Sequence, residues 1–315
     1  MAVGNNPQQA EFNHALFVKE TADALLEKNV VFSELKSRGR ILFNQGGTQI
    51  EQRVRNARNT IQGFGPMFES VPAQPQLLTH ATYSWGGFYA DYYIDEWDVL
   101  ANKGESKILD HQDKLLQFLK EDWMEVMEDY MFTNGLTEDP AKIGGFAAFI
   151  KTTGTYAGLS QTNTYWKAQI TNMVSGSWGT TPLQTLTKLE NLCTRGSGNT
   201  RPHAGFMTRT AWNTVHDKIE TIRRIVENPD KVKVGHRNFV NNGVEYFWSD
   251  SAPVDKVWVV NFDTLYLRCQ TSKLFEERTV ETFSPIGQLH QMYSKCQLCC
   301  DNPRMNGVVS ASTIN

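Results

Sequence analysis

The chain has 315 residues, a net charge of −3 and 40% hydrophobic residues, a composition that is ordinary for a globular protein of one large or two smaller domains. No apolar run approaches the ~18 residues of a membrane span, and the polar start lacks the plan of a signal peptide, so we expect a soluble protein with no membrane partner. The five cysteines are an odd number spread over a long chain, which favours reduced thiols in a cytosol over a disulfide framework.

The charge is sorted along the sequence. Residues 36–58 hold six basic side chains and one acid, a balance of +5, whereas residues 91–129 hold twelve acids and four lysines, a balance of −8. Sorted charge of this kind usually finds partners and fixes register rather than stabilising a core. The pattern therefore predicts contacts between the two patches in different copies of the chain.

Residues 48–100 are predicted to be extended. Glycines and prolines interrupt them, and the pieces between, Leu77–Tyr83 and Phe88–Val99, are rich in aromatic and β-branched residues. We expect a long two-stranded excursion whose tip lies near residues 60–75. Because an isolated two-stranded ribbon is marginal in water, the excursion should lie on a neighbouring subunit.

A long helix is predicted over Lys107–Phe132, where apolar residues recur with helical spacing. Asn134 and Gly135 should end it with a left-handed residue. Its acidic face carries Glu121, Glu125 and Glu128, while its core face is predicted to carry Ile108, Leu115, Leu119, Trp123, Val126 and Tyr130.

The second half of the chain interleaves helices and strands and is predicted to be a mixed α/β domain. One helix begins at Pro182 and another covers Trp212–Val226. Strands are expected at Val232–Val234, at Val244–Trp248 after an Asn242-Gly243 turn, and as a continuous run over residues 257–269.

Two chemical alternatives are open. Cysteine spacing at Cys296, Cys299 and Cys300 could serve part of a zinc site, but only the distant His290 and Cys193 or Cys269 could complete four ligands. A carbohydrate-active enzyme could use the acidic and aromatic residues of segment 85–98, provided that two carboxyls lie ~5–10 Å apart across a cleft. We expect structural thiols and a solvated acidic segment instead, with no catalytic, metal or cofactor-binding residues and no cofactor.

Taken in order, the elements resemble the major capsid proteins of tailed double-stranded-DNA bacteriophages, which have the HK97-like fold. The local matches are YAGLSQ (156–161) with Asn163 and Trp166, SDSAPVDKVWVVNFDTLYL (249–267) and LCCDNPRMNGVV (298–309). The resemblance implies an α+β fold with an N-terminal arm, an extended β-hairpin loop (the E-loop), a long spine helix in a perimeter domain, and a mixed α/β axial domain. Its expected bounds are an arm at 1–47, the loop at 48–104, the perimeter domain at 105–180 with the spine at about 105–133, the axial domain at 181–272, and a C-terminal return at 273–315.

The resemblance implies a non-enzymatic head protein that self-assembles into an icosahedral-type shell of hexamers and pentamers around double-stranded DNA. Its partners would be itself, portal, scaffolding and head-completion proteins, and packaged DNA bound without sequence specificity. It would be assembled in the host cytoplasm and reside in the virion. The alternative within the fold is an encapsulin-like nanocompartment shell that encloses cargo proteins. The sequence shows no long, charge-rich helical leader, so we expect no cleaved scaffolding segment.

The charge pattern adds one specific hypothesis about contacts between subunits. Arg53, Arg55 and Arg58 of one copy should lie over Glu121, Glu125 and Glu128 of another. Arg53 and Arg55 are the better pair, because residues two apart share one face of a strand, whereas Arg58 would point the other way.

Overall fold

The computed structural model describes residues 29–57, 76–95, 105–135, 142–173, 182–195, 200–222, 238–280 and 287–310. The chain divides into two compact units, each built from separate stretches of sequence. The first unit takes the chain up to Gly47, Trp85–Gly145 and Tyr266–Leu298. The second takes Thr48–Ser84, Phe146–Leu265 and the chain from Cys299 on.

These units do not follow the consecutive segments expected from the sequence. The loop expected at 48–104 is divided after Ser84, and the axial segment expected at 181–272 passes to the first unit from Tyr266 on. The cause is strand pairing, because strands that are distant in sequence share one sheet in each unit. The units gather strands from several of these segments, and the expected segment bounds stay a prediction.

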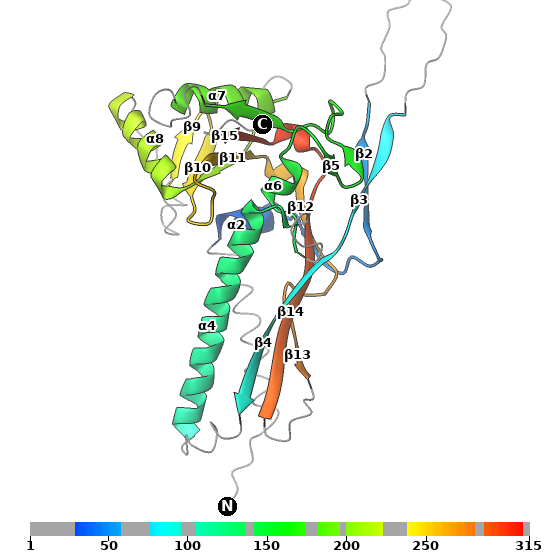
Figure 1. Cartoon of the computed structure of the whole chain (residues 1–315), viewed down its shortest axis with the longest axis vertical. Coiled ribbons are helices and arrows are strands. Elements are labelled where there is room, and N and C mark those ends of the chain that lie inside the picture. Colours follow the sequence, from blue (N-terminus) through cyan, green and yellow to red (C-terminus); the bar gives the residue numbers. More distant parts are fainter. Residues whose placement is uncertain are drawn as a thin grey trace, which may run out of the picture. The chain divides into compact units, whose positions relative to one another are not determined.

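The first unit is a five-stranded sheet with a long helix. In the sheet β14 pairs antiparallel with both β4 and β13, and β1 lies parallel to β12 in the order β1-β12-β14-β13. The helix α4 has 28 residues and runs beside the long strands in Figure 1. The elements of this unit are α2 (Val30–Ser37), β1 (Ile41–Leu42), β4 (Gly86–Asp95), α4 (Glu105–Phe132), β12 (Leu265–Cys269), β13 (Glu276–Val280) and β14 (Gly287–Cys300).

The predicted long helix is present as α4, but it ends differently from the prediction. Neither Asn134 nor Gly135 has a left-handed backbone conformation. Glycine is required at 135 for another reason, because a Cβ there would lie 2.4 Å from the carbonyl oxygen of Ile143. The end of the helix is thus set by a close approach of two backbone segments.

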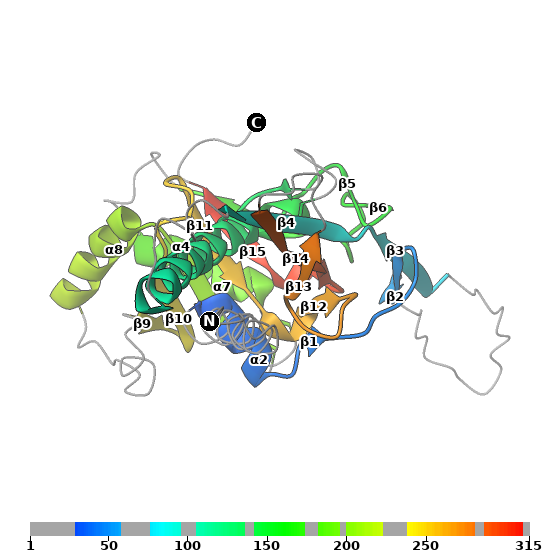
Figure 2. The same cartoon turned by 90° about the horizontal axis from the view of Figure 1, so that it is seen from below.

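The second unit contains a six-stranded mixed sheet in the order β7-β15-β11-β8-β10-β9 and the separate hairpin β2–β3. The helices α7 and α8 lie on one face of the larger sheet, visible in Figures 1 and 2, where Leu189, Val215 and Tyr246 share one buried cluster. On the other face Phe146 stacks on Phe206 with ring centroids 5.8 Å apart. The elements are β2 (Ile50–Arg55), β3 (Leu78–Tyr83), α6 (Phe146–Phe149), β5 (Thr155–Tyr156), β6 (Leu159–Ser160), β7 (Gln169–Asn172), α7 (Pro182–Cys193), β8 (Ala204–Met207), α8 (Arg209–Ile222), β9 (Asn238–Asn241), β10 (Val244–Trp248), β11 (Lys256–Val260), η2 (Phe262–Thr264), η3 (Pro303–Met305) and β15 (Gly307–Ser310).

Local predictions for this half are mostly confirmed. The helix that begins at Pro182 and the hairpin turn at Asn242-Gly243 are both present, and the positive φ angles of 49° and 86° in the turn suit a type I′ geometry. The helix predicted over Trp212–Val226 appears as α8, which is described as far as Ile222. The strand predicted at Val232–Val234 lies outside the described residues.

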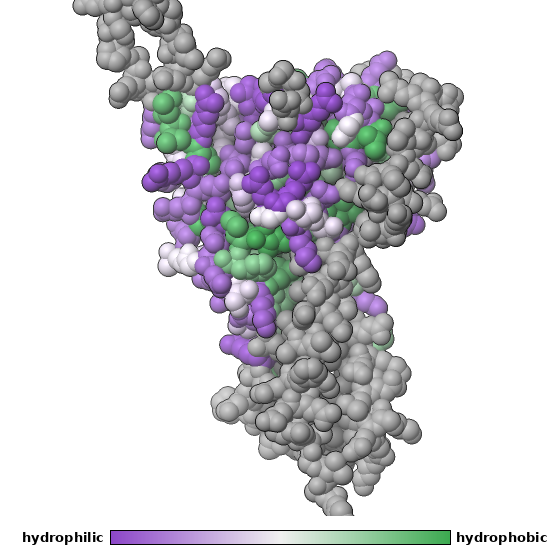
Figure 3. Space-filling model, turned by 180° about the vertical axis from the view of Figure 1, so that it is seen from behind, coloured by the Kyte–Doolittle hydropathy of each residue, from purple (hydrophilic) through white to green (hydrophobic). Residues whose placement is uncertain are grey.

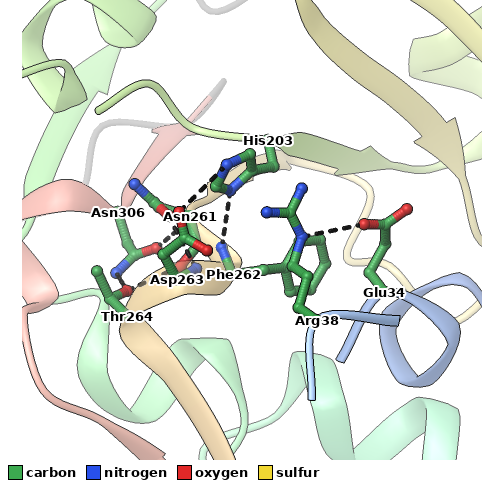
Figure 4. Close-up of polar contacts among 8 residues, drawn as sticks. All are labelled: Glu34, Arg38, His203, Asn261, Phe262, Asp263, Thr264 and Asn306. Carbon is green, nitrogen blue, oxygen red and sulfur yellow. Dashed lines mark hydrogen bonds and ion pairs between the residues drawn. The ribbon is translucent and has the colours of Figure 1, made fainter. Parts of the chain in front are cut away.

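The continuous strand predicted over residues 257–269 is wrong, because the short helix η2 divides it into β11 and β12. Asn261 caps η2 by accepting a hydrogen bond from the Asp263 N–H at 3.0 Å. The buried Asn306 side chain accepts from the Asn261 N–H at 2.7 Å and donates to Thr264 Oγ1 at 3.0 Å, as Figure 4 shows. These polar groups turn the chain inside the core without leaving their backbone partners unbonded.

Candidate assembly surfaces

The β2–β3 hairpin has one buried face and one exposed basic face. Its strands pair antiparallel over six residues each, and exposure alternates along β2 with the strand period. Ile50 and Val54 face inward, and Arg53 and Arg55 are both exposed on the other face. Arg58 lies outside the described residues.

The two exposed arginines have different surroundings. Arg55 Nε donates to the Ala57 carbonyl at 3.0 Å, and its guanidinium lies 5.4 Å from the ring centroid of Tyr165. Arg53 stands opposite His80 on the neighbouring strand. Arg55 is therefore oriented by contacts inside its own unit, whereas Arg53 lies on the open face of the strand.

The hairpin is bonded to the rest of the second unit at both ends of its paired strands. The Asn163 amide donates to Asn56 Oδ1 at 2.8 Å, directly after β2, and the Thr82 N–H donates to the Ala157 carbonyl at 3.0 Å, near the end of β3. The Asn56 N–H donates to the Leu77 carbonyl at 2.9 Å, which extends the pairing of the strands. These bonds hold the paired strands on the second unit.

The buried face of α4 differs from the predicted core face. Trp123 is 5% exposed as expected, but Val126 is 39% exposed, and Met127 and Met131 are completely buried in its place. The packing of Trp123 explains this difference. Its ring centroid lies 5.0 Å from that of Phe88 and 4.9 Å from that of Phe275, and Met127 and Met131 follow Trp123 at intervals of four residues on the same side of the helix. Leu119 and Tyr130 are half-buried, and the side chains of Ile108 and Leu115 are not among those described.

The exposed face of α4 combines acids with apolar side chains. Glu121 and Glu125 are exposed and Glu128 is half-buried. Phe118, 61% exposed, and Val126 lie on the same stripe as Asp122 and Glu125, since the positions are three and four residues apart. An acidic stripe with apolar members is the character expected of a contact surface rather than of a merely solvated helix face. The spacing of Phe118, Asp122 and Val126 in the sequence already indicates this mixed stripe. The prediction missed it because it assigned Val126 to the core.

Figure 3 shows one face on which hydrophilic residues dominate and apolar residues form a few small patches. Among the described residues, no helix is long and apolar enough to cross a membrane.

The cysteines form no metal site within the described part of the chain. All five are buried free thiols, and no group of three or more His, Cys, Asp or Glu side chains there could hold an ion. Burial raises the pKa of Cys193 to about 12 and also raises the pKa of Cys300. These thiols are therefore protonated at neutral pH, which suits packing better than ligation.

The acidic and aromatic segment at 85–98 lies within the described residues as far as Asp95. Asp91 accepts a hydrogen bond from the Gln291 amide at 2.8 Å, and Gln291 in turn accepts from Arg278 Nε at 2.8 Å, so that the three side chains form a row across β4, β14 and β13. Trp85 Nε1 donates to the Gly47 carbonyl at 2.9 Å. Glu96, Trp97 and Asp98 lie outside the described residues. The described members are thus held by the sheet and its neighbouring loop.

Comparison with known structures gives the architecture a family context. No protein-family model and no curated protein sequence matches the chain. The capsid protein of Cyanophage A-1(L) superposes with a TM-score of 0.63 at 13% identity, covering 90% of this chain and 93% of the other. The chain has the HK97-like capsid fold. The capsid protein of a native GTA particle matches similarly, with a TM-score of 0.61 at 9% identity and coverage of 88% and 89%.

The HK97-like fold also occurs in a shell that is not a phage head. The holo-SrpI encapsulin complex from Synechococcus elongatus PCC 7942 matches with a TM-score of 0.51 at 11% identity, covering 74% of this chain and 76% of that chain. The capsid and nanocompartment hypotheses therefore share this architecture. Of the structures compared, the phage and GTA capsids match over more of the chain and with higher TM-scores.

Proposed function

We propose that this chain is the major capsid protein of a tailed-phage-type particle, which self-assembles into a closed shell of hexamers and pentamers around double-stranded DNA. The observation that carries the proposal is the extent of the likeness, which covers 90% of this chain and 93% of a cyanophage capsid protein. Its role is structural, with no catalytic residue and no cofactor. Its further partners are portal, scaffolding and head-completion proteins, and its place is the virion after assembly in the host cytoplasm.

In this proposal the β2–β3 hairpin is the extended loop and α4 is the spine helix. The hairpin exposes Leu78, 60% accessible, beside its arginines, and a two-stranded ribbon gains stability by lying on another surface. The exposed stripe of α4 offers acids next to Phe118 and Val126. The two surfaces carry opposite charges, and each also exposes apolar side chains. Overlap between copies would therefore pair the charges and bury the apolar groups of both.

The charge contact joins Arg53, Arg55 and Arg58 of one copy to Glu121, Glu125 and Glu128 of the next. A single exposed ion pair contributes only ~0–1 kcal/mol. Repetition at every subunit contact makes the pairs decisive for register, while apolar burial supplies most of the cohesion. Since the contacts are partly exposed, they weaken as salt shortens the Debye length to below ~8–10 Å.

The first experiment is the size of the purified protein. Sedimentation and electron microscopy should show closed particles in the megadalton range, and a protein that stays at the 35.7 kDa monomer or a small multiple would refute the shell proposal.

The second experiment reverses charges on the proposed contact. Arg53→Glu with Arg55→Glu should slow or block assembly at low salt, and Glu121→Arg with Glu125→Arg should restore it in part. The matched control is Lys188→Glu with Lys273→Glu, which changes the net charge equally at exposed positions outside both surfaces. Normal assembly of the double arginine variant would refute the contact and leave the shell proposal intact.

A nanocompartment shell is the second candidate function, and the structural match to an encapsulin supports it. The two candidates differ in their contents. Particles isolated from their source cells should contain nuclease-protected double-stranded DNA if the chain is a capsid protein, and protein cargo without DNA if it is a nanocompartment shell.

A further inference from the structure

Two arginines from distant parts of the sequence lie against one aromatic ring in the second unit. The guanidinium carbon of Arg55 is 5.4 Å from the ring centroid of Tyr165, and that of Arg304 is 5.6 Å from it. Arg55 ends β2, and Arg304 belongs to η3. The backbone of Tyr165 is anchored beside the hairpin, because the Tyr165 N–H donates to Asn163 Oδ1 at 3.0 Å and the Asn163 amide donates to Asn56, directly after β2.

A third arginine extends this group. Arg195 lies just after the end of α7. Its pKa is lowered, mainly by burial and to a smaller extent by the positive charge of Arg304. Its Nε is buried and has no acceptor among the described residues. Arg195 and Arg304 are both half-buried, so their mutual repulsion is screened less by water than it would be on an open surface.

The group lacks a counter-charge in the described part of its own chain. The ion pairs found there are Glu34–Arg38, His203–Asp263 and Arg209–Asp250, and none involves Arg55, Arg195 or Arg304. Two like charges at one ring, with a third close enough to Arg304 to interact with it electrostatically, repel one another unless an anion joins them. A planar guanidinium binds a carboxylate with two parallel hydrogen bonds, and Tyr165 sets the orientation of two such groups.

We propose that Arg55 and Arg304, which lie against Tyr165, form together with Arg195 a carboxylate-binding site that receives acidic side chains from the α4 helix of a second copy of this chain. The site is called the arginine cluster below. The proposal rests on shell assembly, and it adds to the contact on the exposed face of β2 a second site at the end of that strand, where Arg55 lies.

Complementarity favours α4 as the occupant. Asp122 and Glu125 are exposed and lie three residues apart on one stripe, with the apolar Val126 beside them. The arginine cluster offers the complementary groups, which are cations for the carboxylates and the Tyr165 ring for Val126. Burial of Val126 against Tyr165 and the arginine stems would exclude water from the ion pairs and strengthen them.

The test uses single substitutions that keep the fold. Arg304→Gln should raise the lowest protein concentration at which particles form by about tenfold, since charge-assisted hydrogen bonds contribute ~1.5–3 kcal/mol and 1.4 kcal/mol is a factor of ten. Arg304→Lys keeps the charge without the planar fork and should give a smaller increase. Lys273→Gln is the matched control at an exposed position outside the proposed contact surfaces, with an expected effect of less than about threefold. Each variant is first checked for an unchanged thermal unfolding midpoint in the unassembled state.

A cross-linking experiment identifies the partner. Arg304→Cys and Glu125→Cys are placed on separate chains, mixed, assembled and treated with a short bis-maleimide, to which the five native thiols are inaccessible because they are buried. A product of twice the 35.7 kDa chain in the mixture supports the proposal, and Asp255→Cys in place of Glu125→Cys should give none. A cross-link formed only when both cysteines are on one chain would overturn it.

Other outcomes also decide the matter. If Arg304→Gln assembles like the wild type, the arginine cluster is not a contact between copies, although wild-type particles would still support the proposed function. If Arg304→Gln assembles normally but retains less DNA, the cluster binds phosphates instead, and the proposal is wrong. If the wild type forms no particles, the proposed function fails before this inference is reached.

Discussion

Replacing Trp123 tests how α4 is attached to its sheet. The indole is 5% exposed and lies between the rings of Phe88 and Phe275. A buried indole covers on the order of 150–250 Å². At ~25 cal/mol per Å², and with the usual cavity left behind, Trp123→Ala should cost ~3–5 kcal/mol of unfolding free energy.

The indole N–H adds a second, sharper expectation. Trp123 Nε1 is buried without an acceptor among the described residues. An unsatisfied buried donor costs ~1–3 kcal/mol, so Trp123→Phe loses ring area but removes that penalty. The net change should be within ~1 kcal/mol of the wild type.

Urea unfolding of the unassembled subunit, followed by far-ultraviolet circular dichroism, measures both changes. Trp123→Ala should lower the urea midpoint by at least about 1 M, since the slope for small proteins is ~1–3 kcal/mol per M. Val126→Ala is the matched control on the same helix, and at 39% exposure it should shift the midpoint little. The assignment of faces is refuted if Val126→Ala costs as much as Trp123→Ala. If Trp123→Phe is as damaging as Trp123→Ala, the indole N–H has a partner and the reasoning about its penalty is wrong.

Two further predictions concern buried polar groups. Asn306→Leu removes an acceptor for the Asn261 N–H and a donor to Thr264, and should cost ~2–4 kcal/mol by urea unfolding, whereas Asn306→Asp keeps the acceptor and should cost less. Because burial raises the pKa of Cys193 to about 12, native protein holds this thiol protonated, while the unfolded chain ionises at its ordinary pKa of ~8.5. The contribution of this thiol to stability should therefore be constant below about pH 8.5 and fall as pH rises towards 12, and Cys193→Ala should reduce the slope of stability against pH in that range. Chelators should leave the melting temperature unchanged at any of these pH values, and a fall in melting temperature on removal of stoichiometric zinc would show that the protein binds a structural metal.

The elements that could be predicted are those whose signals are local. The long helix α4, the start of α7 at Pro182 and the turn at Asn242-Gly243 are each encoded within one stretch of sequence. Periodicity, a proline at the first helical turn and a glycine with positive φ need no distant partner. Their positions were accordingly close to those observed.

The face of α4 could not be predicted in the same way. Val126 and Tyr130 follow Trp123 with helical spacing, but so do Met127 and Met131, and both sets are apolar. Tertiary packing decides between them: Phe88 and Phe275 pack on Trp123, Phe88 also contacts Tyr130, and Met127 and Met131 are completely buried whereas Val126 is 39% exposed. Phe275 is distant in sequence, so no window around the helix contains this information.

The same limit explains why the arginine cluster escapes a reading of the sequence. A charge count over residues 36–58 finds Arg53 and Arg55 because they are neighbours, and it treats them as equivalent. The fold separates them, since only Arg55 reaches Tyr165, and it brings Arg304 to the same ring from the opposite end of the chain. Sorting of charge along the sequence predicts a contact between copies, but it cannot identify side chains that only the fold brings together from β2, η3 and the end of α7. The proposed arginine cluster therefore predicts that variants of Arg304 impair assembly, although that residue lies in neither of the two charged stretches of the sequence.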